Sequence, residues 1–260
     1  MMNPSMKMNE LGVSILSWGR HDKLKTSLES YKNNDLFDLV GDANIFFNEH
    51  KPEDEKLAGQ YPLRLDGNNQ NVGIGWGMVF SVMLSHAPYV LFLENDFELA
   101  ATKEETYNQL SLGLDFIKQG NLDIVKYRRL DNYKTTCNET KNWYDRGERW
   151  GCAEENWHVG FTADDDFGNN NRDICNLLSI GDVELWGMSS ENAGWSNNPF
   201  MCKREWFLEF AESVGFNVNN FLVDSLKNVN TLDFEQQIKD KWIEKGANVG
   251  IINPALFNHQ

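Results

Sequence analysis

A short apolar segment that runs directly into acidic residues most constrains the fold of this chain. The five apolar residues Tyr89–Leu93 are followed without a break by Glu94–Asp96. An apolar run of this length, introduced here by Pro88, is typical of a strand that is buried on both faces, as in a parallel sheet. Acids directly after such a strand lie at the carboxyl edge of the sheet, where open α/β sheets bind ligands.

Two carboxylates that are separated by one residue point to the same side of an extended chain. Glu94 and Asp96 have this spacing, so both can hold a hard divalent cation, or one can hold the cation while the other binds a ribose hydroxyl. The alternative is that these acids cap the next segment and remain solvated. Spacing alone leaves both interpretations open.

The rest of the chain alternates short apolar runs with amphipathic segments, which is typical of an α/β fold with a parallel-type sheet. Strands are expected within residues 11–20, 43–47, 61–70, 89–93, 122–130, 159–163 and 248–257. Helices are expected at residues 21–34, 76–87, 102–120, 198–215 and 233–246. We expect Asp22 to cap the first of these helices and Gly120 to end the third.

The composition changes near residue 131, where the chain becomes rich in tryptophan, asparagine and aspartate. The tryptophans of this part are Trp143, Trp150, Trp157, Trp186 and Trp195. Such a stretch is typical of binding loops on a scaffold rather than of a second core. We therefore expect one domain with two lobes that meet near residue 131.

The net charge restricts the ligands that the chain can bind. Lysine and arginine total 24 against 39 aspartates and glutamates, which gives a formal charge of −15. This field repels nucleic acids and anionic membrane surfaces, so we expect neither as a partner. A small phosphate-bearing ligand is compatible with an acidic protein if a divalent cation neutralises its charge locally.

The cysteines and the first residues indicate a cytoplasmic location. The four cysteines form no C-x-x-C pair, so we interpret them as free thiols in a reducing compartment. The first ten residues lack the apolar region of a signal peptide, and no apolar run is long enough to span a membrane.

Two further clusters are alternatives for ligand binding. Gly73, Gly75 and Gly77 follow a polar loop rather than a strand, which argues against a dinucleotide fingerprint and for a close backbone approach at a helix start. Asp164–Asp166 fail the spacing of a calcium loop, and we interpret them as a solvated acidic loop.

Five segments occur in the order seen in GT-A nucleotide-sugar glycosyltransferases, and the chain resembles the small GT-A domains encoded by large DNA viruses of algae. These segments are VSILSWGRHDKLKTSLESY, NVGIGWGMVFSVMLSHAPYVLFLENDFEL, WSNNPFMCKREWF, DFEQQIKDKW and INPALFNHQ. The resemblance implies a Rossmann-like GT-A fold, in which helices flank a mixed, mostly parallel sheet. It also implies that residues 1–260 form a single GT-A domain. Residues 11–130 would form the nucleotide-sugar-binding lobe, and residues 131–260 a tryptophan-rich lobe for acceptor binding and catalysis.

The resemblance also assigns site residues. Those implied in nucleotide binding are Ser17, Trp18, Arg20, Asp66, Asn71, Gly73, Glu94 and Asn95. Glu94–Asp96 matches the family's D-x-D element, in which the last acid, here Asp96, holds Mn²⁺ or Mg²⁺ on the diphosphate. The first position, Glu94, departs from the family's usual aspartate. A lone histidine is more often structural than a ligand, but the resemblance implies that His259 completes the metal shell.

The implied activity is a metal-dependent transfer of a sugar from a UDP-sugar to a saccharide acceptor. The donor would be a UDP-hexose, such as UDP-galactose or UDP-glucose, or UDP-xylose. An inverting transfer needs a base, for which Asp233, Glu235 and Glu191 are candidates and Asp164–Asp166 are rivals. A retaining transfer needs no such base.

Two other functions stay open from the sequence. A non-catalytic carbohydrate-binding protein would use the tryptophan-rich loops, and a nucleotidyltransferase would use a similar sheet and acids. The chain ends one residue after His259, from which we expect a domain of a longer multi-domain transferase.

Overall fold

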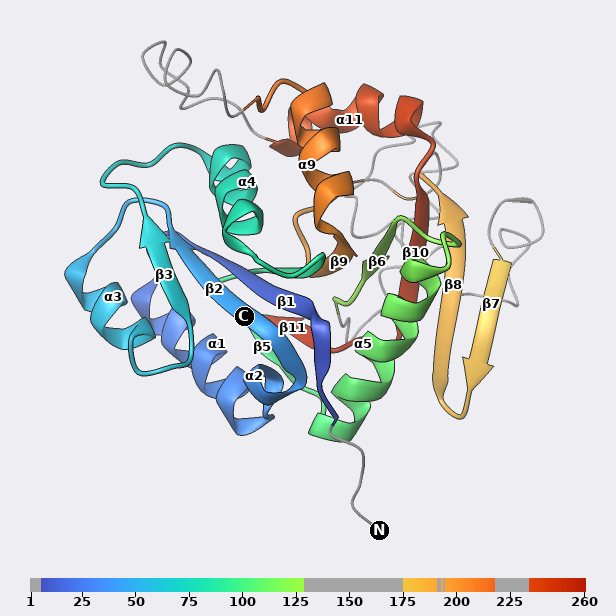
Figure 1. Ribbon diagram of the computed structural model, residues 1–260, viewed down its shortest axis with the longest axis horizontal. Helices are drawn as coiled ribbons and strands as arrows, with labels where there is room; N and C mark the ends of the chain where they lie inside the picture. Colours follow the sequence, from blue (N-terminus) through green and yellow to red (C-terminus); the bar gives the residue numbers. More distant parts are fainter. Residues whose placement is uncertain (1–5, 129–174, 191–192, 194, 218–233) are drawn as a thin grey trace.

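The computed structural model describes residues 6–128, 175–190, 193, 195–217 and 234–260. Within these residues, nine strands form one sheet in the order β3-β2-β1-β4-β9-β6-β10-β8-β7 (Figure 1). The strands are β1 (Met8–Ser17), β2 (Val40–Phe47), β3 (Arg64–Gly67), β4 (Tyr89–Glu94), β6 (Ile124–Lys126), β7 (Cys175–Ile180), β8 (Val183–Ser189), β9 (Phe200–Lys203) and β10 (Asn248–Asn253). A second sheet pairs β5 (Phe97–Leu99) with β11 (Phe257–His259).

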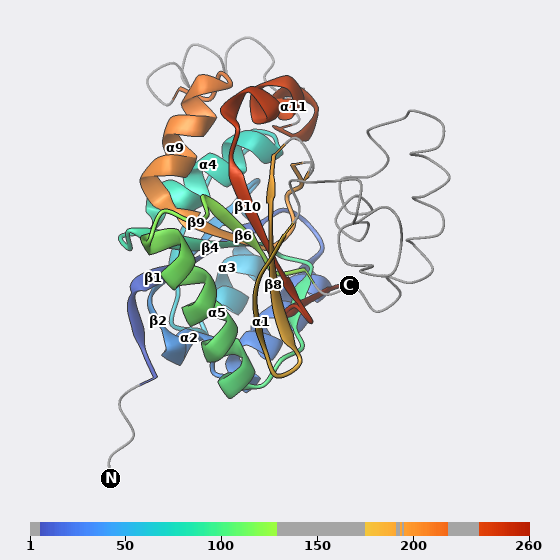
Figure 2. The ribbon, with the colours of Figure 1, turned by 90° about the vertical axis from the view of Figure 1, so that its right-hand side faces the viewer.

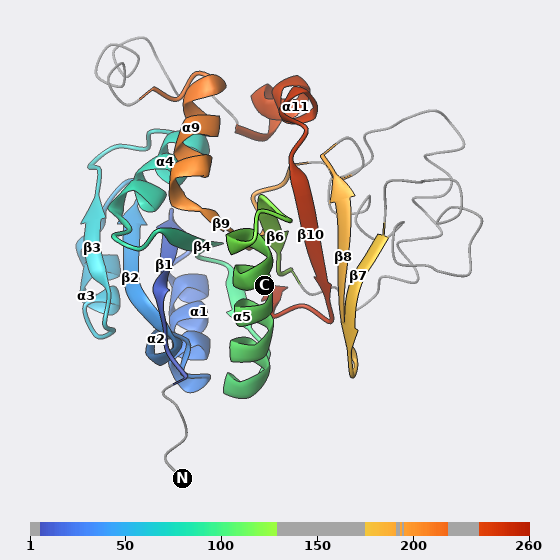
Figure 3. The ribbon, with the colours of Figure 1, turned by 45° about the vertical axis from the view of Figure 1, so that its right-hand side comes forward.

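The large sheet is mixed but runs mostly in one direction. β1 pairs in parallel with β2 and β4, β2 with β3, and β6 with β10. β9 is antiparallel to both β4 and β6, and β8 is antiparallel to both β10 and β7. Among the described strands only β8 and β9 therefore run against the others, and the expected mixed, mostly parallel α/β sheet is confirmed. Figure 3 shows β3 and β7 at the two outer edges.

Helices pack on both faces of this sheet. The helices are α1 (His21–Asn33), α2 (Leu36–Leu39), α3 (Pro52–Ala58), α4 (Ile74–Leu84), α5 (Lys103–Lys118), α9 (Arg204–Ser213) and α11 (Phe234–Lys245). Alternate strand residues enter two cores: Val13 and Leu91 pack with α1, α2, α3 and α5, whereas Val90 and Phe92 pack with α4, α9 and α11. The last three helices lie together in Figures 1 and 2. Burial on both faces explains why Tyr89–Leu93 is continuously apolar.

Several expected boundaries are wrong. The segment expected as a helix at 198–215 begins as a strand, because Phe200–Lys203 fills the gap between β4 and β6. The strand expected at 248–257 is divided into β10 and β11. Asp22 lies in the first turn of α1, and Arg20 occupies the capping position without a side-chain hydrogen bond. Gly120, with φ of 74°, does end α5 as expected.

Other expectations concern residues that the structure does not describe. They are the strand at 159–163, the acidic residues Asp164–Asp166, and the tryptophans Trp143, Trp150 and Trp157. The short helices α2 and α3 and the hairpin β7–β8 were not expected from the sequence. None of the helices within the described ranges is long and apolar enough to cross a membrane.

Asp42 fixes the starts of the strands that carry the candidate site. Its carboxylate accepts hydrogen bonds from the Arg64 guanidinium at 2.8 Å and from the backbone N–H of His86 at 2.7 Å. Burial opposes ionisation of Asp42, but the His86 N–H and the Arg64 side chain outweigh it and lower the pKa of the carboxyl below its ordinary 3.8. The edge opposite the candidate site is therefore tied together by a charged hydrogen-bond cluster.

The lowered pKa of Asp42 predicts a pH-dependent contribution to stability. The contribution is complete above the ordinary pKa of 3.8 and is lost as the pH falls through the lower folded-state pKa. We expect Asp42→Asn to destabilise the protein by about 1–2 kcal/mol at pH 7 and by progressively less below pH 3.8. Urea unfolding across this pH range measures the difference. Asp115→Asn, at an exposed position of α5, is the control, and a difference that stays constant with pH would contradict this account.

Candidate active site

The ends of four parallel strands form the edge at which the expected site residues meet. The register pairs Leu16 of β1 with Glu94 of β4, and it pairs Ser17 of β1 with Phe47 of β2. β1 lies between β2 and β4, so the strand order reverses at this point. The connection through α1 packs on one face, and the connection through α4 packs on the other. Such a switch point is where open α/β sheets bind ligands.

Asn95 joins the loop after β4 to the loop after β1. Its side-chain amide donates hydrogen bonds to the backbone carbonyls of Gly19 at 2.9 Å and Trp18 at 3.4 Å. Its own backbone carbonyl accepts a hydrogen bond from the Ser27 hydroxyl at 3.1 Å. These contacts hold the two loops together, and they engage the Asn95 amide within the protein.

Asp96 is a buried carboxylate that two basic side chains and a histidine ring approach. Its side chain is 5% exposed. The Oδ2 atom lies 2.5 Å from Arg20 Nη1, 3.2 Å from His259 Nε2 and 3.9 Å from Lys23 Nζ. The Oδ1 atom is also buried and has no hydrogen-bond partner among the described residues. An unsatisfied buried carboxylate oxygen is costly, so this atom is available for a ligand.

His259 reaches Asp96 because the last strand returns to β5. β11 pairs antiparallel with β5, and His259 lies opposite Phe97 with ring centroids 5.2 Å apart. The backbone N–H of Gln260 donates to the Asp96 carbonyl at 2.9 Å, and Lys23 Nζ donates to the Gln260 carbonyl at 2.7 Å. Residues that are far apart in sequence are thus brought into one cluster, and Asp96 and His259, which the resemblance had linked, lie side by side.

A second part of the edge lies at the ends of β2 and β3 and is organised by Asn48. This side chain is 2% exposed. It donates to Asn71 Oδ1 at 2.9 Å and to the Gly73 carbonyl at 3.2 Å, and it accepts from the Val72 N–H at 2.7 Å. Gly73, with φ of 82°, is the residue directly before α4, so it lies at a helix start as expected.

Trp18 and Asp66 are exposed at the same edge. Trp18 is 52% exposed, and its indole N–H donates to Glu49 at 3.1 Å. An exposed aromatic ring at a ligand-binding edge offers a face on which a base can stack. Asp66 accepts a hydrogen bond from the backbone N–H of Gly67 at 2.7 Å.

The sequence did not single out Asn48, Glu49 or Lys23. Glu49 has a left-handed backbone, with φ of 73°, and directly follows Asn48 at the end of β2. The only sequence signal for these two residues is a pair of polar residues directly after the apolar end of a strand.

The edge continues beyond β4 to β9 and β6. Lys126 is fully buried, and its ammonium donates to the Ser196 carbonyl at 2.8 Å and lies 4.9 Å from the centre of the Trp195 ring. Arg128 donates to Asn198 at 2.8 Å and bridges in parallel to Phe257 on β11. Two basic side chains therefore lie at the end of β6, and each is engaged within the protein.

Trp195 is part of the core rather than a binding surface. It is 5% exposed and packs against Phe200 at 5.3 Å and Trp242 at 5.1 Å between ring centroids. Of the tryptophans expected to bind sugars, Trp186 is half-buried in β8, and it lies opposite Ile251 of β10.

The expected catalytic bases are not placed by the structure. Glu191 and Asp233 lie outside the described residues, and Glu235 is described only as a backbone position at the start of α11. No group of three or more metal-ligating side chains occurs among the described residues.

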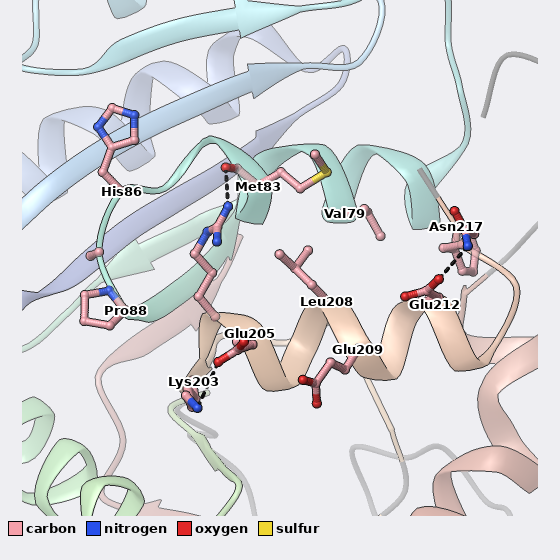
Figure 4. A pocket seen from close by; sticks show the side chains of 13 residues that line it. Val79, Met83, His86, Pro88, Lys203, Glu205, Leu208, Glu209, Glu212 and Asn217 are labelled. Carbon is pink, nitrogen blue, oxygen red and sulfur yellow. Dashed lines mark hydrogen bonds and ion pairs between the residues drawn. The ribbon is translucent and has the colours of Figure 1, made fainter. Parts of the chain in front are cut away.

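A cavity of about 610 Å³ lies elsewhere, between α4 and α9. Val79, Met83, Leu208 and Glu209 are among the residues that line it (Figure 4). Pro88 and Lys203 also line it, and these residues flank the start of β4 and the end of β9. The cavity is thus at the opposite edge of the sheet from Asp96, so the shallow edge at Asp96, and not this cavity, is the candidate site.

Comparison with known proteins supports the fold. No protein-family model and no curated protein sequence matches the chain. Among solved structures, TarS 1–349 from S. aureus is similar over 96% of this chain and 60% of that chain, with a TM-score of 0.55 and 11% sequence identity. The chain thus spans 60% of the length of TarS 1–349. At this identity the similarity shows a shared mixed α/β fold alone.

Two further structures align over about half of the chain or less. The mannosyltransferase PcManGT from Pyrobaculum calidifontis, in complex with GDP-Man and Mn²⁺, covers 49% of this chain and 38% of that chain, at 12% identity and a TM-score of 0.40. TarS 1–349 in complex with UDP covers 47% of this chain and 37% of that chain, at 16% identity and a TM-score of 0.36. At these TM-scores neither match adds to the argument.

The contacts of Asn48 predict that its substitution lowers both the stability of the protein and its affinity for a ligand at this edge. Asn48→Ala removes the side chain that holds residues 71–73, so we expect a loss of about 1–3 kcal/mol in stability. If these residues contact the ligand, affinity for UDP with Mn²⁺ should also fall, by about tenfold. Urea unfolding and calorimetric titration measure the two effects. Asn108→Ala, at an exposed position of α5, is the control. Unchanged UDP affinity in a destabilised Asn48→Ala protein would exclude residues 71–73 from the nucleotide site.

Proposed function

We propose that the chain is a metal-dependent nucleotide-sugar glycosyltransferase that transfers a sugar from a UDP-sugar to a saccharide acceptor. The observation that carries this proposal is Asp96, a buried carboxylate at the switch point of the sheet. Among the described residues one of its oxygens has no partner, and Arg20, Lys23 and the His259 ring surround the other. The shared fold with TarS is consistent with this activity.

The charge distribution fits a diphosphate ligand. The chain carries a formal charge of −15, which opposes the approach of an anion. Arg20 and Lys23, at the start of α1, supply local positive charge, and the N-terminus of this helix adds the positive end of its dipole. These groups would offset the charge of the diphosphate at the edge of the sheet.

Asp96 and His259 are the residues that would hold Mn²⁺ or Mg²⁺. The buried Oδ1 atom of Asp96 fits a hard cation, and the His259 ring lies beside the same carboxylate. When bound, a divalent cation would act as a Lewis acid that stabilises the negative charge on the departing nucleoside diphosphate.

The remaining residues bind and orient the donor in this proposal. Trp18 would stack on the uracil base, and the segment that contains Asn71 and Gly73 would contact the nucleotide. Glu94 would lie near the ribose. We further propose that the donor sugar is a hexose or xylose. The acceptor would bind in the part of the chain after residue 131. If the transfer is inverting, Asp233, Glu235 and Glu191 are the candidate bases.

A titration of UDP tests the proposal directly. We expect wild-type protein to bind UDP at least tenfold more tightly with Mn²⁺ than without it, and we expect Asp96→Asn to abolish this difference. Isothermal calorimetry measures both affinities. Asp115→Asn makes the same charge change at an exposed position of α5 and should behave like wild type.

The outcomes separate the alternatives. No UDP binding with or without Mn²⁺ would contradict the proposal, and binding of saccharides alone would then indicate a carbohydrate-binding protein. Full metal dependence in Asp96→Asn would exclude Asp96 as a ligand. Hydrolysis of a panel of UDP-hexoses and UDP-xylose identifies the donor, and turnover of another nucleotide sugar in their place would overturn the choice of UDP.

A further inference from the structure

Arg20 occupies a position that the nucleotide-pocket assignment does not explain. Its guanidinium points to the Asp96 carboxylate at 2.5 Å, although 76 residues separate the two in sequence. Arg20 and Gly19 both have left-handed backbones, with φ of 54° and 55°. This conformation is unfavourable for arginine, so it is consistent with a side chain that is held by a specific contact.

The two partners of this ion pair differ in how freely each can move. The Asp96 side chain is 5% exposed, and the backbone carbonyl of Asp96 is held by Gln260. The Arg20 side chain is 57% exposed, and within the described part of the chain its only hydrogen bond or ion pair is with Asp96. A ligand that binds beside this ion pair would therefore displace the Arg20 side chain and leave Asp96 in place.

Lys23 and His259 are less free to move than Arg20, because each is held by a further contact. Lys23 is 3.9 Å from the Asp96 oxygen, and its ammonium donates to the Gln260 carbonyl at 2.7 Å. His259 is held in β11 and packs against Phe97. Arg20 is the member of this cluster with the most exposed side chain, at 57% against 34% for Lys23 and 43% for His259.

We propose that Arg20 couples cation binding to diphosphate binding. Arg20 forms an ion pair with Asp96. A divalent cation held by Asp96 would repel the guanidinium, which would then pair with the donor diphosphate through two N–H groups and two phosphate oxygens. This inference rests on the proposed function and assigns Arg20 as a positioning residue within it.

The coupling has a thermodynamic consequence. Without a diphosphate, a cation on the same carboxylate would place its charge beside the Arg20 guanidinium, which would have no second anion to bind, so the cation would bind weakly. With a diphosphate, the displaced guanidinium gains a new partner, so the cation and UDP strengthen each other by the same factor. Removing the charge of Arg20 should strengthen binding of the cation alone and weaken this mutual effect.

The test measures Mn²⁺ affinity by electron paramagnetic resonance of free Mn²⁺, with and without UDP. We expect Arg20→Gln to bind Mn²⁺ alone about tenfold more tightly than wild type, and to show a UDP effect at least tenfold smaller. Lys25→Gln is the control, because it removes the same charge from an exposed position of α1, where Lys25 forms an ion pair with Glu29. It should match wild type.

Three results would overturn the inference. They are an unchanged or weaker affinity of Arg20→Gln for Mn²⁺ alone, an undiminished UDP effect in this variant, and an equal change in Lys25→Gln, which would indicate a general charge effect. Each is interpreted with wild-type protein that binds Mn²⁺ and UDP together. If wild type binds neither, the proposed function itself fails. Circular dichroism of Arg20→Gln establishes that the variant is folded.

Discussion

The burial of the Asp96 carboxylate is the constraint on which the architecture of this edge depends. A buried carboxylate is costly unless positive groups and hydrogen-bond donors surround it. Here the compensating groups come from the start of α1 and from the last strand, which are more than 200 residues apart in sequence. The same carboxylate that requires these groups also leaves one oxygen without a partner in the described part of the chain.

The site extends to either side of this acid through buried polar residues. Asn48 holds the loop before α4 on one side, and Lys126 holds the segment before β9 on the other. Both side chains are almost fully buried, and both donate hydrogen bonds to backbone carbonyls. Both side chains supply hydrogen-bond donors to loop backbones. Trp18, Arg20 and Asp66, in contrast, are exposed at this edge.

The sequence predicted the β-α framework and the place of Asp96, because both follow from local patterns. The apolar run before Glu94 indicates a buried strand, and its neighbours in the sheet follow from the alternation of strands with helices. The sequence does not predict β9, because Phe200–Lys203 leads directly into α9. The helical pattern of α9 suggests that the helix begins before residue 200. Only the tertiary gap between β4 and β6 shows that this segment is a strand.

Contacts between distant residues were the least predictable part of the site. The resemblance implied that Asp96 and His259 act together, and the structure brings them within 3.2 Å. It did not imply that Arg20 pairs with Asp96, because a single sequence carries no signal for a contact across 76 residues. Asn48 was missed for the same reason, since its role depends on a loop that folds back on it.

The central claim is that Asp96 binds a divalent cation together with a nucleoside diphosphate. Anomalous diffraction at the manganese absorption edge, from crystals grown with UDP and Mn²⁺, tests this claim most directly. The account predicts one strong anomalous peak in contact with the Asp96 carboxylate and the diphosphate. Bound UDP with no peak at Asp96, or a manganese peak held elsewhere in the chain, would contradict it.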